Sequence, residues 1–298
     1  MISRRLALGL AAALPLVWGL SGCGKGGGSQ PVMKPATPPV VKEDTGGTKA
    51  PAGDKAKPAG DKTEAAAGAE EGWGTITGQI IFEGNVPEPT ILVKQGDQNA
   101  KNAEVCAVKD VVSEDLVVDK ETKGLKWAVV SIGGKLKIHP DLAKAEGTAE
   151  MGQEHCHFIP HVLAMRQGQK FIVSSNDAVG HNSNCAGIKN ATFNPLIPAA
   201  PPGGKTTLDG PDLVADRLKV NCNIHPWMSA YIIVFDHPYF AVTDDKGNFK
   251  IENVPAGAQK LVIWQDKGFN EGSAKGNDIT VKAGETTDLG KITYTPKN

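Results

Sequence analysis

The chain has 298 residues, a formal net charge of −1 and 5% aromatic residues. A nearly neutral chain without a basic face is not typical of nucleic-acid binding, so that class of partner is excluded. Glycine and proline are abundant, with 35 and 20 residues, and short β-branched runs recur at roughly ten-residue intervals, which predicts an all-β protein.

The first 22 residues have the pattern of a secretion signal. Arg4 and Arg5 precede a short apolar run that is too short to be read as a membrane-spanning helix. Positions 20–23 read Leu-Ser-Gly-Cys, which resembles the lipobox of bacterial lipoproteins. The resemblance implies that residues 1–22 are removed and that Cys23 carries lipid, anchoring an exported protein that faces the periplasm or the cell surface. No aspartate follows Cys23, which favours the outer membrane; an ordinary signal peptide with a chance cysteine is the alternative.

Residues 23–72 are composed mainly of glycine, alanine, proline, lysine and acidic residues, and the sequence Pro-Ala-Gly-Asp-Lys occurs at 51–55 and again at 58–62. This stretch shows no apolar periodicity, so it cannot bury enough surface to offset the entropy of ordering. We predict a disordered linker.

Strand patterns follow the linker. Residues 73–82 alternate polar and apolar side chains, and residues 125–132 form a second candidate strand. Near the end of the chain, Asp-Asp-Lys-Gly at 244–247 separates two alternating runs, which predicts a hairpin.

These patterns resemble the carboxypeptidase regulatory-like (transthyretin-like) β-sandwich. The matching pieces are Gly-Thr-Ile-Thr-Gly at 74–78, Thr-Asp-Asp-Lys-Gly-Asn-Phe at 243–249 and Val-Pro-Ala-Gly-Ala at 254–258. The resemblance implies a sandwich whose first part is residues 73–149 and whose second part is residues 237–298.

A compact group of metal-binding residue types lies between these parts. Cys222, His225 and Met228 are spaced Cys-x-x-His-x-x-Met and offer a thiolate, an imidazole and a thioether. With one further histidine this is the ligand set of a mononuclear type 1 copper site, in which the methionine is a weak axial ligand. His181, on an upstream Asn-Asp loop, is well placed to supply the second imidazole. A zinc site would want another cysteine or histidine in place of Met228.

Residues 150–236 resemble a cupredoxin, and the loop spacing is closest to the amicyanin and plastocyanin branch. Besides the ligands, the resemblance rests on Phe-Ile-Pro at 158–160, Ser-Asn-Asp at 175–177 and His-Asn at 181–182. It implies a Greek-key β-sandwich with one type 1 copper ion. We expect this cupredoxin domain to be inserted in, or adjacent to, the other sandwich; two sequential domains are the alternative.

The resemblance also implies roles for the neighbours of the ligands. Asn182 is expected to tie the two ligand loops together, and Pro226 to stiffen the second loop. The edge of His225 is expected to face the redox partner. Trp227 either packs inward or forms an apolar partner-contact patch beside His225, and we favour the patch.

Five cysteines are present. With Cys23 assigned to lipid and Cys222 to metal, three remain, and an exported protein sits where disulfides persist. We favour a Cys106–Cys156 disulfide, because Cys156 begins the first cupredoxin strand and Cys106 lies in the preceding region. Cys185 is then either a bystander thiol or a partner of Cys222, which would abolish the copper site.

A second histidine cluster comprises His155, His157 and His161. On a strand, His155 and His157 would share one face and could hold a second metal, although surface or hydrogen-bonded histidines are the alternative. His139 and His237 each precede a proline and are expected to be structural.

Together these features predict a membrane-anchored blue-copper protein that carries single electrons between redox partners, with a cytochrome or a dehydrogenase suggested by family analogy. We predict no enzymatic activity, because seven histidines cannot furnish a trinuclear oxidase centre and no second catalytic metal set is visible. The alternatives are a copper-storage or delivery lipoprotein, and a carbohydrate- or protein-binding sandwich with a non-redox cupredoxin.

Overall fold

The computed structural model describes residues 71–296. The predicted signal peptide, the lipidated Cys23 and nearly all of the predicted linker lie outside this range. Within it, strands predominate and the helices are the short α1 (Ala103–Cys106) and a single 3-10 turn (Pro140–Leu142), which confirms the predicted all-β class. In this part of the chain, no helix has the length and apolar character needed to cross a bilayer.

One group of sheets draws its strands from both ends of the described chain. A three-stranded sheet has the order β16-β1-β20, and a second sheet has the order β15-β4-β17-β18 with β19 also paired to β17. The bounds are β1 (Trp73–Phe82), β4 (Val129–Gly133), β15 (Phe240–Val242), β16 (Asn248–Pro255), β17 (Gly257–Gln265), β18 (Gly268–Phe269), β19 (Asn277–Val281) and β20 (Thr286–Tyr294).

The two sheets of this group share one apolar core. Ile76 and Ile80 of β1 are fully buried with Ile132 of β4 and Ile263 of β17. Strands that precede residue 134 therefore pair and pack with strands that follow residue 239, although the domain boundaries given above remain predictions.

The turn predicted at 244–247 is present between β15 and β16, but the predicted hairpin is not formed, because β15 pairs with β4 and β16 pairs with β1 in another sheet. The Asp244 carboxylate accepts hydrogen bonds from the backbone N–H groups of Lys246 and Asn248 at 2.9 and 2.8 Å. Gly247 has φ +79°, and a Cβ there would lie 2.2 Å from the Ile80 carbonyl oxygen, so only glycine fits.

The strand predicted at 125–132 begins later than expected, at Val129. Trp127 has φ +62°, a left-handed conformation that interrupts an extended chain. The alternation of polar and apolar residues does not indicate that one residue adopts a left-handed conformation, so the sequence pattern placed the start of the strand too early.

A second group of sheets is built from residues 148–235. Its sheets have the orders β10-β13-β14-β7 and β12-β8-β5-β6, with a short β11-β9 pair. The bounds are β5 (Thr148–Glu154), β6 (His157–Ile159), β7 (Val162–Arg166), β8 (Lys170–Ser175), β9 (His181–Asn182), β10 (Asn184–Ala186), β11 (Leu196–Ile197), β12 (Thr206–Asp209), β13 (Asp216–Asn221) and β14 (Ser229–Phe235). Met151, Phe171, Leu218 and Ile232 from both larger sheets share one core, so this region is also a β-sandwich.

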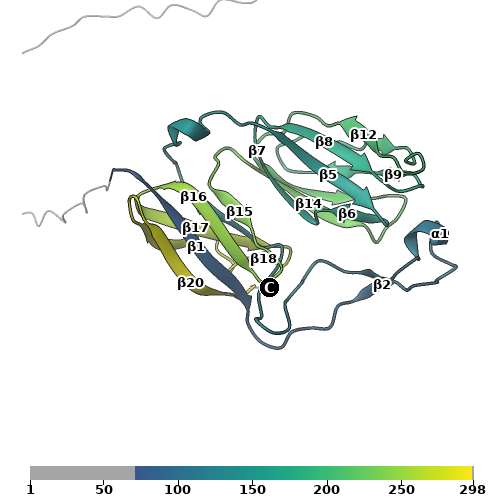
Figure 1. The fold of residues 1–298 in the computed structure, drawn as a ribbon, viewed down its shortest axis with the longest axis horizontal. Helices are drawn as coiled ribbons and strands as arrows, with labels where there is room; N and C mark the ends of the chain where they lie inside the picture. Colours follow the sequence, from purple (N-terminus) through teal and green to yellow (C-terminus); the bar gives the residue numbers. More distant parts are fainter. Residues whose placement is uncertain (1–70, 297–298) are drawn as a thin grey trace, which may run out of the picture. The chain divides into compact units, whose positions relative to one another are not determined.

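Residues 91–112, here called the cap segment, connect to this second sandwich. Within the segment, β2 (Ile91–Val93) pairs with β3 (Val111–Val112), and α1 lies between them in the sequence. Figure 1 shows β2 and α1 on the connection that carries the segment. Val93, Ala107 and Val111 form a small buried cluster against which Trp227 packs. A disulfide joins Cys106 of α1 to Cys156, across a sequence separation of 50.

Candidate metal centre

The loop that carries the Cys-x-x-His-x-x-Met spacing connects two paired antiparallel strands. β13 ends at Asn221 and β14 begins at Ser229, and these two residues are register partners. The Cys222 N–H donates to the Met228 carbonyl at 3.2 Å, and the Met228 N–H donates to the His225 carbonyl at 2.9 Å. The strand pairing therefore closes a short loop whose Cys222 and Met228 side chains are each 2% exposed.

His181 approaches this loop from β9. Its Nδ1 atom lies 2.9 Å from Nδ1 of His225, and His225 Nδ1 lies 3.8 Å from the Cys222 sulfur. Both imidazoles are fully buried, and the donor atoms of the three residues lie within 4.8 Å of one another. The structure thus brings together His181, Cys222 and His225, with Met228 at the end of the same loop.

The outer nitrogen of each imidazole is also engaged. His181 Nε2 lies 2.8 Å from Asp177 Oδ2, and His225 Nε2 lies 3.1 Å from the amide oxygen Asn102 Oδ1. A carboxylate or an amide oxygen only accepts hydrogen bonds, so each Nε2 carries a proton. The two Nδ1 atoms then face each other with lone pairs, and this arrangement requires a positive partner between them, a proton or a metal ion.

Asp177 connects the His181 loop to the turn between β5 and β6. Besides His181, its carboxylate accepts from the backbone N–H groups of His155 and Cys156, at 2.6 and 2.8 Å. Burial raises the pKa of Asp177, but these hydrogen bonds outweigh it and the pKa is lowered. Sequence reasoning assigned Asp177 no role, although its place four residues before a predicted ligand histidine was a usable signal.

Among the described residues two cysteines are free, and their pKa values are shifted in opposite directions. Burial raises the pKa of the Cys222 thiol, but its contacts with His181, His225 and backbone N–H groups outweigh burial and lower the pKa to about 5. Cys185 has no such partners, and burial raises its pKa to about 12. Both are free and buried, so the Cys185–Cys222 pairing is not formed, whereas Cys106 and Cys156 form the expected pair.

Asn182 contacts the ligand loop from β9. Its side-chain oxygen accepts a hydrogen bond from the Asn223 N–H at 2.8 Å and lies 3.5 Å from the Cys222 sulfur. Pro226 is exposed in the same loop, directly after His225. Asn182 therefore joins the loop that carries His181 to the loop that carries Cys222.

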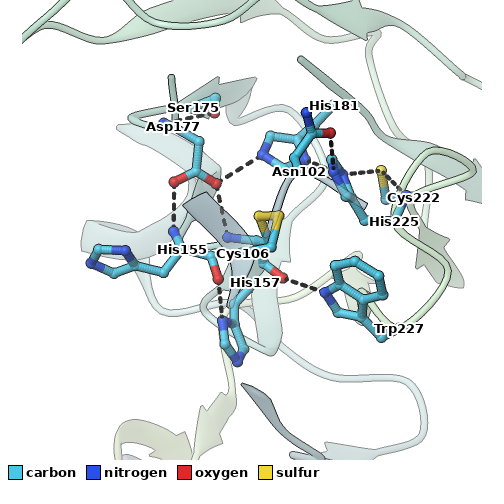
Figure 2. The surroundings of a disulfide bond; sticks show 11 residues. Asn102, Cys106, His155, His157, Ser175, Asp177, His181, Cys222, His225 and Trp227 are labelled. Carbon is cyan, nitrogen blue, oxygen red and sulfur yellow. Dashed lines mark hydrogen bonds and ion pairs between the residues drawn. A yellow bond between two sulfur atoms is a disulfide. The ribbon is translucent and has the colours of Figure 1, made fainter. Parts of the chain in front are cut away.

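The environment of His225 differs from the expectation. The side chain is 0% exposed, so the prediction that its edge faces a partner is wrong. Asn102 of the cap segment covers Nε2, and the Trp227 ring lies 5.3 Å from the His225 ring (Figure 2). Trp227 lies beside His225 but also packs against the cap segment, with its Nε1 donating to the Cys156 carbonyl at 3.3 Å.

The second histidine cluster does not assemble. His155 and Cys156 have φ +50° and +56° and form the turn between β5 and β6, so His155 does not share a strand face with His157. His161 points elsewhere, with Nε2 3.4 Å from Asp266. Within residues 71–296, the three histidines form no metal-binding group.

The donor set fits copper better than zinc. Two nitrogen ligands that each lie about 2 Å from a metal are roughly 3 Å apart, close to the 2.9 Å between the two Nδ1 atoms. Thiolate, imidazole and thioether ligands favour copper, whereas a structural zinc site takes four cysteine or histidine ligands. Cys185 is the remaining free cysteine of the described residues, and its raised pKa disfavours the thiolate form that a metal needs.

Comparisons with known proteins found partial similarities. The family model described as polysaccharide lyase family 4, domain II, matches residues 235–289, less than half of the chain. This match lies mostly within the second part of the predicted transthyretin-like sandwich, and that finer assignment remains a prediction. A comparison with curated proteins gave no match.

Three solved structures illustrate the structural similarities. A copper-containing nitrite reductase from Thermus scotoductus is 16% identical, with a TM-score of 0.26 over 30% of this chain and 22% of the reductase, so the chain spans about a fifth of that protein. A purple cupredoxin from Nitrosopumilus maritimus is 16% identical, with a TM-score of 0.24 over 30% of this chain and 99% of the cupredoxin. Amicyanin from Paracoccus versutus is 16% identical, with a TM-score of 0.23 over 36% of this chain and 97% of amicyanin. These low scores carry no functional weight beside the geometry of the side chains.

Proposed function

We propose that this protein is a one-electron carrier with a single type 1 copper ion held by His181, Cys222 and His225, with Met228 as a weak fourth ligand. The observation that carries the proposal is the pair of buried Nδ1 atoms, 2.9 Å apart, beside the sulfur of Cys222. A copper ion bound there supplies a Cu(I)/Cu(II) couple, which takes up and releases one electron.

The surrounding residues would keep the ligand geometry constant. Asp177 and Asn102 hold the outer nitrogens of the two imidazoles, and Asn182 joins the two loops. The low pKa of Cys222 supplies a thiolate at neutral pH. A shell that moves little between two oxidation states lowers the reorganisation that accompanies electron transfer.

Burial of the ligands favours electron transfer over copper delivery. His181, Cys222 and His225 are all at most 2% exposed, and a copper donor must let its acceptor reach the metal. We therefore expect the loaded protein to retain copper against a chelator and to show a reversible one-electron couple. Rapid loss of copper to the chelator would favour the delivery alternative.

We further propose that the protein acts outside the cytoplasm, is lipid-anchored through Cys23 in the outer membrane, transforms no chemical substrate and exchanges electrons with a redox protein. The Cys106–Cys156 disulfide supports an exported setting, where such bonds persist. Radiolabelled palmitate should enter the wild-type chain in a bacterial host and should not enter Cys23→Ala. Equal labelling of both would contradict the anchor.

The copper site is tested by loading the full-length protein with copper and recording the visible spectrum and metal stoichiometry. We expect one copper per chain and an intense thiolate-to-copper band that is absent in Cys222→Ser. Cys185→Ser is the matched control, because it removes the other free buried thiol of residues 71–296 and should keep the band. A protein that binds no copper, or a band that survives in Cys222→Ser, would overturn the proposal.

A further inference from the structure

The metal-site imidazole of His225 is enclosed by a part of the chain that is remote in sequence. Asn102 lies 123 positions before His225, yet its side-chain oxygen is 3.1 Å from Nε2. The neighbouring Trp227 ring lies 5.3 Å away, and the sulfur atoms of Cys106 and Cys156 lie within 4.8 Å of a His225 ring nitrogen. The cap segment therefore closes the edge of the ring that faces away from Cys222.

Asn102 has a left-handed backbone conformation, and its side chain does not cap the helix that it precedes. It has φ +54° and ψ +49°, the left-handed conformation, and occupies the N-cap position of α1. Asparagine is favoured at this position because its side chain can accept a hydrogen bond from the first turn of the helix, but Asn102 makes no such bond. Its oxygen is directed to His225 instead, and left-handed residues other than glycine often mark functional positions.

The disulfide connects the cap segment to the residues around Asp177, which holds the imidazole of His181. Cys106 lies one helical turn after Asn102 and is bonded to Cys156. The Cys156 N–H donates to Asp177 Oδ2, the same oxygen that His181 Nε2 contacts. The disulfide thus joins the short helix that follows Asn102 to a residue that is hydrogen-bonded to Asp177.

We propose that Asn102 is a positioning residue for His225 and that the disulfide-anchored cap segment holds Asn102 in place. By accepting the Nε2 proton, Asn102 keeps Nδ1 of His225 unprotonated and directed at the metal position, and prevents the ring from turning away. This inference rests on the copper site proposed above, but the closure of the His225 edge is a property of the chain alone.

The first test uses the full-length protein without metal. Asn102→Gly removes the side chain and tolerates the left-handed backbone. Loss of one hydrogen bond changes an opening equilibrium by up to about tenfold, so we expect diethyl pyrocarbonate to modify His225 about tenfold faster, measured by peptide mass spectrometry. The exposed His155 is the internal reference. Asn99→Gly is the control, because Asn99 lies on the same segment and its side chain contacts Asp97.

The second test uses the copper-loaded protein. Replacing an outer hydrogen-bond partner of a ligand histidine costs about 10-fold to 100-fold in metal affinity, and we expect this loss in Asn102→Gly. The reduction potential should rise in Asn102→Gly, because the imidazole donates less electron density, and should fall in Asn102→Asp, which places an anion at Nε2. Asn99→Gly should change neither quantity.

The outcomes separate the two proposals. If Asn102→Gly matches the wild type in modification rate, affinity and potential, the positioning role is wrong. If Asn99→Gly shows the same changes, the effect belongs to the cap segment as a whole and the role of Asn102 is again wrong. If the wild type binds no copper, the proposed function fails, while the modification rate of His225 still decides whether Asn102 closes its edge.

Discussion

The two ligand imidazoles are held in different ways. His181 is held by Asp177, which is four residues away on the same loop and carries a negative charge. His225 is held by Asn102, which is 123 positions away on the cap segment and is neutral. The first support belongs to the sandwich that carries the ligands, and the second is contributed by a segment outside its sheets.

The difference in charge has an electrostatic consequence. Burial lowers the pKa of His181, but hydrogen bonds and charges from Asp177 and Cys222 outweigh burial and raise it. His181 therefore lies between two anionic groups, which stabilise positive charge at the site. The neutral contact at His225 adds no charge, so Asn102 only orients the imidazole and covers its outer edge.

Removing the disulfide should cause the largest loss of stability. The loss should mainly affect the cap segment, which supports His225. A bond across a sequence separation of 50 stabilises by about 4 kcal/mol through restriction of the unfolded chain. We expect Cys106→Ala with Cys156→Ala to lose about this free energy of unfolding in guanidinium chloride. Cys185→Ala, which removes a buried sulfur without a crosslink, should lose about 1 kcal/mol. Equal losses in the two proteins would show that the cap segment does not depend on the disulfide.

Substitution of Asp177 should mainly weaken the support of His181. Asp177→Ala leaves three hydrogen-bond donors without their acceptor, and each such loss costs about 1 kcal/mol or more, so we expect a loss of about 3 kcal/mol in unfolding free energy. Asp216→Ala is the control. The Asp216 carboxylate also accepts hydrogen bonds from two backbone N–H groups, those of Ile188 and Lys189, but these contacts are exposed. If Asp216→Ala loses as much unfolding free energy as Asp177→Ala, burial of the Asp177 carboxylate does not make its hydrogen bonds more stabilising.

The smallest effect is expected at the link between the two ligand loops. Asn182→Ala removes the acceptor of the Asn223 N–H and should cost about 1 to 2 kcal/mol, with a shift of the copper-thiolate band. Asn184→Ala, whose side chain contacts the Asn223 side chain at an exposed position, should change stability by less than about 0.5 kcal/mol. The same band shift in both variants would argue against a specific link through Asn182.

Short-range features were accessible to sequence reasoning. Cys222, His225 and Met228 lie within seven positions, so the chain cannot separate them far, and their residue types alone indicate copper chemistry. The alternation in residues 73–82 and the Asp-Asp-Lys-Gly turn likewise correspond to β1 and to the turn before β16. The left-handed residues Trp127, His155 and Cys156 were not accessible, because their conformation depends on contacts with other strands.

The sequence by itself determined the all-β class and the ligand loop, because both depend on residue type and spacing over a few positions. Only the tertiary structure decided that the carboxylate of Asp177 holds His181 and that Asn102 covers His225. The second contact joins residues 123 positions apart, and no local pattern encodes such a contact. It forms because the Cys106–Cys156 bond and the packing of Trp227 bring the cap segment to the imidazole.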